Sequence, residues 1–262
     1  MRKNTVRNSV LLVCSMLLAG PCAHRTPAQT PASPYPKMVP IEQYLMNRDA
    51  EIALARSAAP DAISHDASVL VLARHGYETA VEGKNGWTCI VDRGWGGMLD
   101  HPDFWNPKIR AAGCLNPSAT RSFLPYDLKR TELVLQGHSR EEIIAATQAA
   151  IAKKELPMLE PGAMCYMMSK TSYLFDQGHH TMSHVMFYTA DDGAPWGANL
   201  ANSPIIGVSY WSASPDTYPQ TKSFPRIFVS LIAADKWSDG TPAMHMWFRH
   251  PRHRSAHGNA VL

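Results

Sequence analysis

SVLVLAR at residues 68–74 and WTCIVD at residues 87–92 are the two stretches that decide the fold. Both are short, apolar and rich in β-branched residues, a composition typical of buried strands. The chain between them ends in Lys84-Asn85-Gly86, which is a turn signal. We therefore expect the two strands to pair as a long hairpin or as a bulged strand pair.

Four more apolar runs predict strands, because clusters of Pro, Gly, Asn and Asp separate them. They lie at about residues 164–169, 185–189, 205–211 and 227–233. Strands that follow one another without crossover helices favour an antiparallel sheet. The sequence thus predicts an α+β fold: a single domain with a largely antiparallel sheet, two to three helices and long aromatic or Pro-rich loops.

Three segments carry helical signals. Residues 41–57 follow Pro40 with apolar residues near helical spacing. Asn116-Pro117 supplies an N-cap and a first-turn proline for a helix toward Gln136, with a kink expected at Pro125. Ser139 and Glu142 form a capping box ahead of a third helical pattern, which runs to about residue 156.

The N-terminus has the features of an export signal. Arg2, Lys3 and Arg7 precede an apolar run from Val10 to Ala19, which is too short to span a bilayer. Cleavage after Ala28 gives a signal peptide at 1–28, a Pro-rich tether at 29–40, a domain at 41–245 and a basic tail at 246–262. This predicts a periplasmic or secreted protein without a transmembrane helix in the mature chain. Lipid attachment at Cys22 is the less favoured alternative, because Pro21 stands where such a signal has a small residue.

The charge of the mature chain excludes two partner classes. The chain has 25 basic and 22 acidic residues, and removing the four basic residues of the leader leaves 21 against 22. A net charge of about −1 does not indicate binding to nucleic acid or to an anionic membrane. The remaining basic cluster, residues 249–257, has no regularly spaced apolar residues, which is typical of a solvated tail.

The mature chain has three cysteines, Cys89, Cys114 and Cys165. An oxidising compartment favours one disulfide. Residues 93–117 form an irregular, aromatic segment, and so long a loop needs packing of its own to be ordered. Cys89 precedes this segment and Cys114 lies near its end. We expect these two to pair, and Cys165 in its apolar run to be a buried thiol.

The histidine-rich segment DQGHHTMSH, residues 176–184, is the main candidate site. His179, His180 and His184 can bind zinc or another transition metal, with a carboxylate such as Asp176, Glu78 or Asp191 completing the site. An open coordination position would support metal-assisted hydrolysis, with Glu78 or Asp176 as base and His75 nearby. The zinc-protease signature is absent, because Thr181 stands where its Glu would be. The alternative is a polar loop without metal.

Two further hypotheses concern chemistry at other residues. Met164, Met167 and Met168, with other methionines near histidines, form a soft-ligand mixture that suits Cu(I), although Met also fills irregular cores. A non-catalytic ligand-binding module would instead have an apolar or aromatic pocket around Trp95, Trp105 and Trp196. Its small-molecule or peptide ligand and the oligomeric state are left open by the sequence.

The strand that runs into Arg74-His75-Gly76 resembles the histidine phosphatase motif over about nine residues. That resemblance implies a phosphohydrolase in which His75 is phosphorylated and Arg74 clamps the phosphate. His184 is the nearest candidate for the second histidine of that family, but Val185 stands where the family has Gly. A turn-rich connector follows the motif in place of the family's helix.

Longer phrases, ARHGYETAVEGKNG, FWNPKIR, PGAMCYMMSK, WGANL and KWSDGTPA, resemble those of a family of exported bacterial proteins with no assigned activity. The resemblance covers most of the mature chain. It implies a single exported domain and adds no catalytic residue or ligand.

Overall fold

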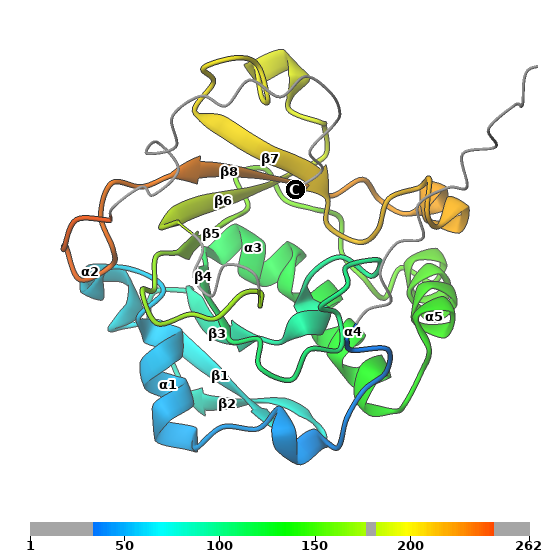
Figure 1. Ribbon diagram of the computed structural model, residues 1–262, viewed down its shortest axis with the longest axis horizontal. Helices are drawn as coiled ribbons and strands as arrows, with labels where there is room; N and C mark the ends of the chain where they lie inside the picture. Colours follow the sequence, from blue (N-terminus) through cyan, green and yellow to red (C-terminus); the bar gives the residue numbers. More distant parts are fainter. Residues whose placement is uncertain (1–33, 177–181, 244–262) are drawn as a thin grey trace, which may run out of the picture. The chain divides into compact units, whose positions relative to one another are not determined.

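The computed structural model describes residues 34–176 and 182–243 (Figure 1). The expected signal peptide, the metal-ligand candidates His179 and His180, and the basic tail lie outside the described residues.

The centre of the domain is one eight-stranded sheet, so the predicted α+β class with a mostly antiparallel sheet is confirmed. The strand order is β2-β1-β3-β4-β5-β6-β8-β7, and the pair β1 and β3 is parallel while the other neighbours are antiparallel. The strands are β1 (Ser68–Ala73), β2 (Gly76–Val81), β3 (Thr88–Asp92), β4 (Ala111–Leu115), β5 (Met164–Met167), β6 (His184–Thr189), β7 (Ile205–Tyr210) and β8 (Phe228–Ala233).

The described residues form five α-helices rather than two or three, because one of the predicted helices is divided into α3 and α4 and the short α2 was not foreseen. Asn47 caps α1 by accepting from the backbone N–H groups of Asp49 and Ala50, so this helix starts seven residues later than predicted. Phe123 separates α3 from α4, next to the expected break at Pro125. The helices are α1 (Arg48–Arg56), α2 (Asp61–Ser64), α3 (Pro117–Ser122), α4 (Leu124–Leu135) and α5 (Arg140–Ala152), with 3-10 turns η1 (Ile41–Gln43), η2 (Gly94–Gly96), η3 (Ala194–Trp196) and η4 (Pro219–Ser223).

The capping box of Ser139 and Glu142 is confirmed at the start of α5. Among the described residues, no helix has both the length and the apolar character needed to cross a bilayer.

The predicted hairpin between residues 68–74 and 87–92 is wrong. β1 forms its hairpin with β2 around the turn at Arg74-His75, and β3 lies on the other side of β1 in parallel, with Ser68 opposite Thr88. The reason is that GYETAV is itself a strand whose middle residues, Glu78 and Thr79, are exposed at the edge of the sheet. Such polar edge strands give a weaker sequence signal than buried ones.

Strand β4 was also missed, because residues 93–117 were expected to be irregular throughout. Its sequence, AAGCL, has no β-branched residue and so carries little intrinsic strand signal. β4 is nevertheless fully buried and pairs with both β3 and β5. Burial on both faces therefore determines this strand, rather than local propensity.

Helices cover both faces of the sheet (Figure 1). Ala55 of α1 packs with Val69, Val91 and Ala112 on one face, where the Cys89–Cys114 disulfide lies. Residues of α3 and α4 pack against β3 to β6 on the other face, in a core that contains Ile90, Leu115, Phe123, Cys165 and Tyr188. Alternate residues of β3 thus belong to different cores, as the two-residue period of a strand requires.

Residues 34–40, the described part of the expected tether, lie against the domain. Tyr35, Met38 and Val39 pack on the core formed by Tyr44, Trp95 and Phe104. The hydroxyl of Tyr35 also donates to Asp176. This stretch is therefore docked along its length instead of free in solvent.

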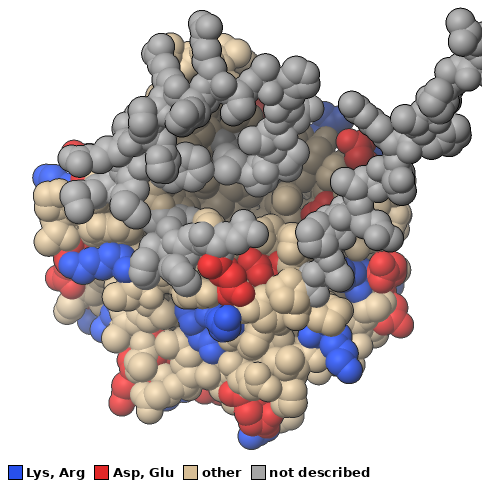
Figure 2. Space-filling view, viewed as in Figure 1, with Lys and Arg blue, Asp and Glu red and all other residues tan. Residues whose placement is uncertain are grey.

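Charges of both signs are mixed over the described residues on the visible face (Figure 2), without a broad patch of one sign. This distribution agrees with the near-neutral charge of the mature sequence.

Candidate functional site

The sheet face that α3 and α4 cover contains a pocket of about 300 Å³. Its walls are mostly apolar, and its few polar side chains come from Asp92, His101, Asp103, Cys165, His184 and two tyrosines. A concave, mostly apolar cavity with a few polar groups is the usual form of a small-molecule site.

The pocket floor consists of alternate residues from five strands. They are Ile90 and Asp92 of β3; Ala111, Gly113 and Leu115 of β4; Cys165 and Met167 of β5; His184, Met186 and Tyr188 of β6; and Val229 and Leu231 of β8. Successive side chains of a strand point to opposite faces, so this period places every second residue in the pocket. Gly113 contributes space at the centre of the floor, since a Cβ atom there would lie 3.8 Å from Sγ of Cys165.

The roof is the loop after β3, residues 93–98, and α4 holds it in place. The guanidinium of Arg130 donates to the carbonyl oxygens of Trp95 (3.0 Å) and Gly97. Nε1 of Trp211 donates to the carbonyl oxygen of Gly96 at 3.1 Å, and the Arg130 guanidinium stacks 3.8 Å from the Trp211 ring centroid. These contacts fix the loop as a wall of the site.

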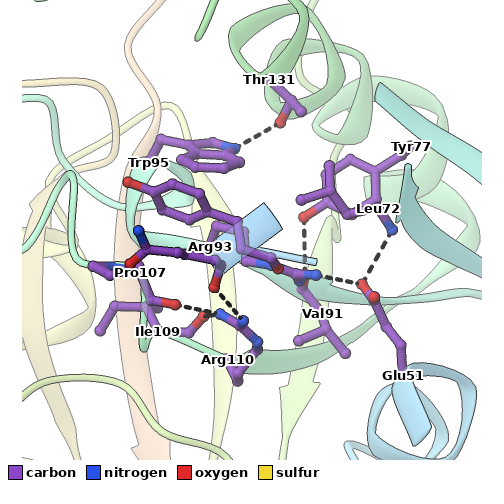
Figure 3. A network of polar contacts seen from close by, with 12 residues as sticks. Glu51, Leu72, Tyr77, Val91, Arg93, Trp95, Pro107, Ile109, Arg110 and Thr131 are labelled. Carbon is purple, nitrogen blue, oxygen red and sulfur yellow. Dashed lines mark hydrogen bonds and ion pairs between the residues drawn. The ribbon is translucent and has the colours of Figure 1, made fainter. Parts of the chain in front are cut away.

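A buried ion pair anchors the same loop from the other face of the sheet (Figure 3). Glu51 of α1 accepts from Arg93 at 2.8 Å and from the backbone N–H of Leu72 at 3.1 Å. Both charged side chains are almost fully buried, and Arg93 also donates to the carbonyl oxygen of Tyr44. Because Arg93 points toward α1, its neighbour Asp92 faces the pocket.

Asp92 and Asp127 form a carboxyl pair at the roof end of the pocket. Asp92 is the last residue of β3 and lines the cavity, whereas Asp127 lies behind it on α4 and is buried. Burial raises the pKa of Asp92 well above its ordinary value, and the neighbouring Asp127 raises it further. Burial also raises the pKa of Asp127, against the lowering effects of its hydrogen bond to Asp92 and the charge of Arg130. Burial and the nearness of a second carboxyl group thus both favour a protonated form of the pair over a doubly ionised one.

Of the described residues in the predicted histidine site, His184 lines the pocket. It starts β6 and is 3% exposed. Its Nδ1 lies 2.8 Å from the carbonyl oxygen of Met182, and because a carbonyl only accepts, Nδ1 carries the proton. Burial lowers the pKa of His184, so the ring is neutral and its Nε2 has a lone pair.

Cys165 is a free, buried thiol in the pocket floor, as predicted. Burial raises its pKa to about 12, and the hydroxyl of Tyr188 donates to its sulfur at 3.6 Å. A protonated thiol is a poor nucleophile and a poor metal ligand. Cys165 therefore acts as an apolar part of the floor.

His75 and Glu78 lie away from this pocket. His75 is exposed in the turn between β1 and β2, and Glu78 on β2 pairs with Arg48 at 2.6 Å in solvent. β1 and β6 are four strand spacings apart, roughly 19 Å at about 4.8 Å per strand. The structure thus does not bring His75 together with His184, which the phosphatase hypothesis requires. Arg74 pairs with Glu42 at the surface.

Asp176 forms part of a different network. Its carboxylate accepts from the hydroxyls of Tyr173 (2.6 Å) and Tyr35 and from the side-chain amide of Asn106 (3.1 Å). The Tyr173 hydrogen bond, followed by that of Tyr35, lowers the pKa of Asp176. This carboxylate therefore joins the docked N-terminal stretch to the domain.

The described residues include part of the predicted metal site. Across residues 34–176 and 182–243, no three His, Cys, Asp or Glu side chains are grouped as a metal site would need. His184 and Asp176 are described, but His179 and His180 are not.

The aromatic residues of the pocket differ from those expected. Trp95 and Trp105 are buried in the core that also contains Tyr44 and Phe104, and Trp196 is 46% exposed. Trp211 is the tryptophan that borders the pocket, and it also borders a second cavity of about 430 Å³ beside η4.

Sequence reasoning missed Asp92, Asp127 and Arg130, although each had a signal. Asp92 ends an apolar strand. Asp127 and Thr131 fall between Leu124 and Val134 on the buried face of α4, at helical spacing. Polar residues at such positions indicate a buried polar network rather than a solvated surface.

No protein-family model, no curated protein and no solved structure matches this chain. The assignment of function therefore rests on the chemistry of the site.

Proposed function

We propose that this is an exported protein that binds one small, largely apolar molecule in the pocket on the sheet. The observation that carries the proposal is the cavity of about 300 Å³, floored by alternate side chains of five strands and roofed by a loop that α4 holds. An apolar cavity of about 150 Å³ binds benzene, so twice that volume suits a molecule of about two rings.

Export is supported by the basic and apolar leader and by the Cys89–Cys114 disulfide, since disulfides persist in oxidising compartments. The resemblance to exported bacterial proteins agrees with this location.

The test is equilibrium dialysis of the mature chain against methoxynaphthalene, a two-ring molecule without a hydrogen-bond donor. Met186→Trp adds an indole to the pocket side of β6 and should weaken binding by about tenfold or more, equivalent to about 1.4 kcal/mol. Leu231→Trp on β8, directly opposite Met186, should do the same.

Val185→Trp is the matched control. Val185 precedes Met186 and, by the period of the strand, points to the other face of the sheet. The affinity of the Val185→Trp variant for methoxynaphthalene should stay within about twofold of that of wild type. No measurable binding by folded wild-type protein, or equal binding by the Met186→Trp, Leu231→Trp and Val185→Trp variants, would refute the proposal. Met186 does not line the second cavity, so this comparison also identifies which cavity binds.

A metal-dependent hydrolase is the second candidate, favoured by one observation. A protonated Nδ1 bonded to a carbonyl, as in His184, is the arrangement that orients a metal-binding histidine through Nε2. The ligand pool would be His179, His180 and His184, and the metal zinc or another transition metal.

Metal content by mass spectrometry of untagged protein tests this candidate. Wild type should contain about one metal ion per chain. The His180→Ala/His184→Ala double variant should lose this ion. The control is His138→Ala, because His138 is partly exposed beside Glu142 and away from this segment. Full metal retention in the double variant would exclude this candidate.

A further inference from the structure

Within residues 34–176 and 182–243, no N–H group is found to donate to the carboxyl pair at the roof end of the pocket. Oδ1 of Asp127 is buried and lacks a hydrogen-bond partner within the part of the chain that the structure describes. Asp92 lies within hydrogen-bonding reach of Asp127. Two carboxylates accept and cannot donate, so the contact between Asp92 and Asp127 is favourable only when one of them holds a proton.

The donors nearest to the pair are used elsewhere. The Arg130 guanidinium donates to the carbonyl oxygens of Trp95 and Gly97, and the Trp211 indole donates to that of Gly96. The Trp95 indole donates to Thr131 at 3.0 Å. None of these hydrogen bonds goes to Asp92, whose carboxyl lines the cavity as an acceptor.

The loop is built to approach this carboxyl closely. A Cβ atom at Gly96 would lie 3.0 Å from Cβ and 3.1 Å from Cγ of Asp92. Only glycine lets the roof lie on the Asp92 side chain without displacing it. The contact confines Asp92 between the roof and Asp127, so the remaining direction for a hydrogen bond is the pocket.

The charges around the pair balance without a ligand. One shared proton leaves the pair with a single negative charge, which Arg130 offsets from one turn further along α4. Arg93 is already neutralised by Glu51. A charged ligand would upset this balance in an apolar site and pay a desolvation penalty. His184, which is neutral, adds a second acceptor to the walls.

We propose that the ligand of this pocket is an uncharged alcohol or phenol with an apolar body, whose hydroxyl donates a hydrogen bond to the proton-sharing pair of Asp92 and Asp127. This inference rests on the proposed function, because it specifies the chemistry of the molecule that the pocket binds. Asp92 touches the ligand, and Asp127 positions and satisfies Asp92.

Three two-ring probes of similar size test the inference on the mature chain. Naphthol has the hydroxyl donor, methoxynaphthalene lacks it, and naphthylmethylamine is cationic at neutral pH. Naphthol should bind about tenfold tighter than methoxynaphthalene, as expected for a hydrogen bond to a charged acceptor. Naphthylmethylamine should bind more weakly than naphthol.

Two variants separate a binding role from a structural one. Asp92→Leu removes the acceptor, so naphthol and methoxynaphthalene should bind equally, with methoxynaphthalene binding retained. Asp127→Asn supplies an N–H to Asp92 in place of the shared proton, so the preference for naphthol should persist. Bound naphthol should also emit as naphtholate in wild type, since excited naphthol gives its proton to an adjacent base, and only as naphthol in Asp92→Leu.

The outcomes distinguish this inference from the proposed function. If neither neutral probe binds, the proposed function fails and this inference with it. If wild type binds naphthol and methoxynaphthalene with equal affinity, the pocket is a binding site but its assigned ligand chemistry is wrong. The same holds if naphthylmethylamine binds most tightly of the three probes. A preference for naphthol that survives in Asp92→Leu would likewise overturn the role of Asp92.

Discussion

Cys89 of β3 and Cys114 of β4 lie directly opposite each other across the antiparallel pair, with their Cα atoms 4.0 Å apart and a disulfide between them. The bridge joins two central strands of the sheet on the face that α1 covers. It therefore ties β3, which ends at Asp92, to β4, which forms the centre of the pocket floor.

Removing this disulfide should destabilise the domain. Cys89→Ala/Cys114→Ala opens a loop of 25 residues, and we expect the free energy of unfolding to fall by roughly 2–4 kcal/mol, measured by urea denaturation. A reducing agent should lower the stability of wild type by a similar amount and leave the double variant unchanged. A reductant effect on the double variant would mean that the bridge is not its target.

Glu51→Ala should lower the free energy of unfolding by about 3–5 kcal/mol, because it leaves the Arg93 guanidinium buried without its counter-ion. Glu51→Gln, which keeps an acceptor oxygen for Leu72, should cost less. Glu78→Ala is the matched control, since it removes an Arg–Glu pair of similar length that lies in solvent, and should change the unfolding midpoint little. Similar losses at Glu51 and Glu78 would contradict the role assigned to the buried pair.

Asp92→Asn should stabilise the protein at neutral pH. The raised pKa of Asp92 means that the folded state holds its proton above pH 4, where the unfolded chain releases it. Relative to the variant, the free energy of unfolding of wild type should therefore be highest below about pH 4. It should fall as the pH rises toward the pKa of Asp92 in the folded state, by up to about 1.4 kcal/mol per pH unit. Asp127, Arg130, Arg93 and Tyr77 are the ionisable groups around it.

Thermal unfolding of wild type and Asp92→Asn between pH 4 and pH 8 measures this difference. The gap between their free energies of unfolding should widen with rising pH. A gap that is constant with pH would show that Asp92 is ionised in the folded protein.

Gly94→Ala should disrupt the roof of the pocket. Its Cβ atom would overlap the backbone carbonyl oxygen of Asp103 and lie 2.8 Å from that of Phe104, and neither can move without the loop. We expect the free energy of unfolding to fall by about 2 kcal/mol or more, and methoxynaphthalene to bind more weakly. Gly97→Ala is the control, because its nearest contact would be an ordinary 3.5 Å to the Gly94 oxygen. Equal stability of the two variants would contradict this account of the loop.

Much of the fold could be predicted from local pattern. The apolar runs at β1, β3, β5, β6, β7 and β8, the capping box of α5 and the pairing of Cys89 with Cys114 all follow from residue type and spacing. These features depend on interactions within a few residues, or on burial that an apolar run demands wherever it lies. Strands β2 and β4 lacked such a pattern, as did the parallel pairing of β1 with β3.

The site was decided at the tertiary level. By itself, the sequence determined that a strand begins directly after the histidine-rich segment and that an apolar strand ends at Asp92. Only the tertiary structure decided that this face is hollow, that His75 and Glu78 lie at a distant edge, and that Asp92 meets Asp127. Two carboxyl groups 35 residues apart meet because α4 packs across the sheet, where Asp127 is buried and Asp92 is half-buried at the end of β3. That contact depends on how helix and sheet fit together, which no local pattern of residues specifies.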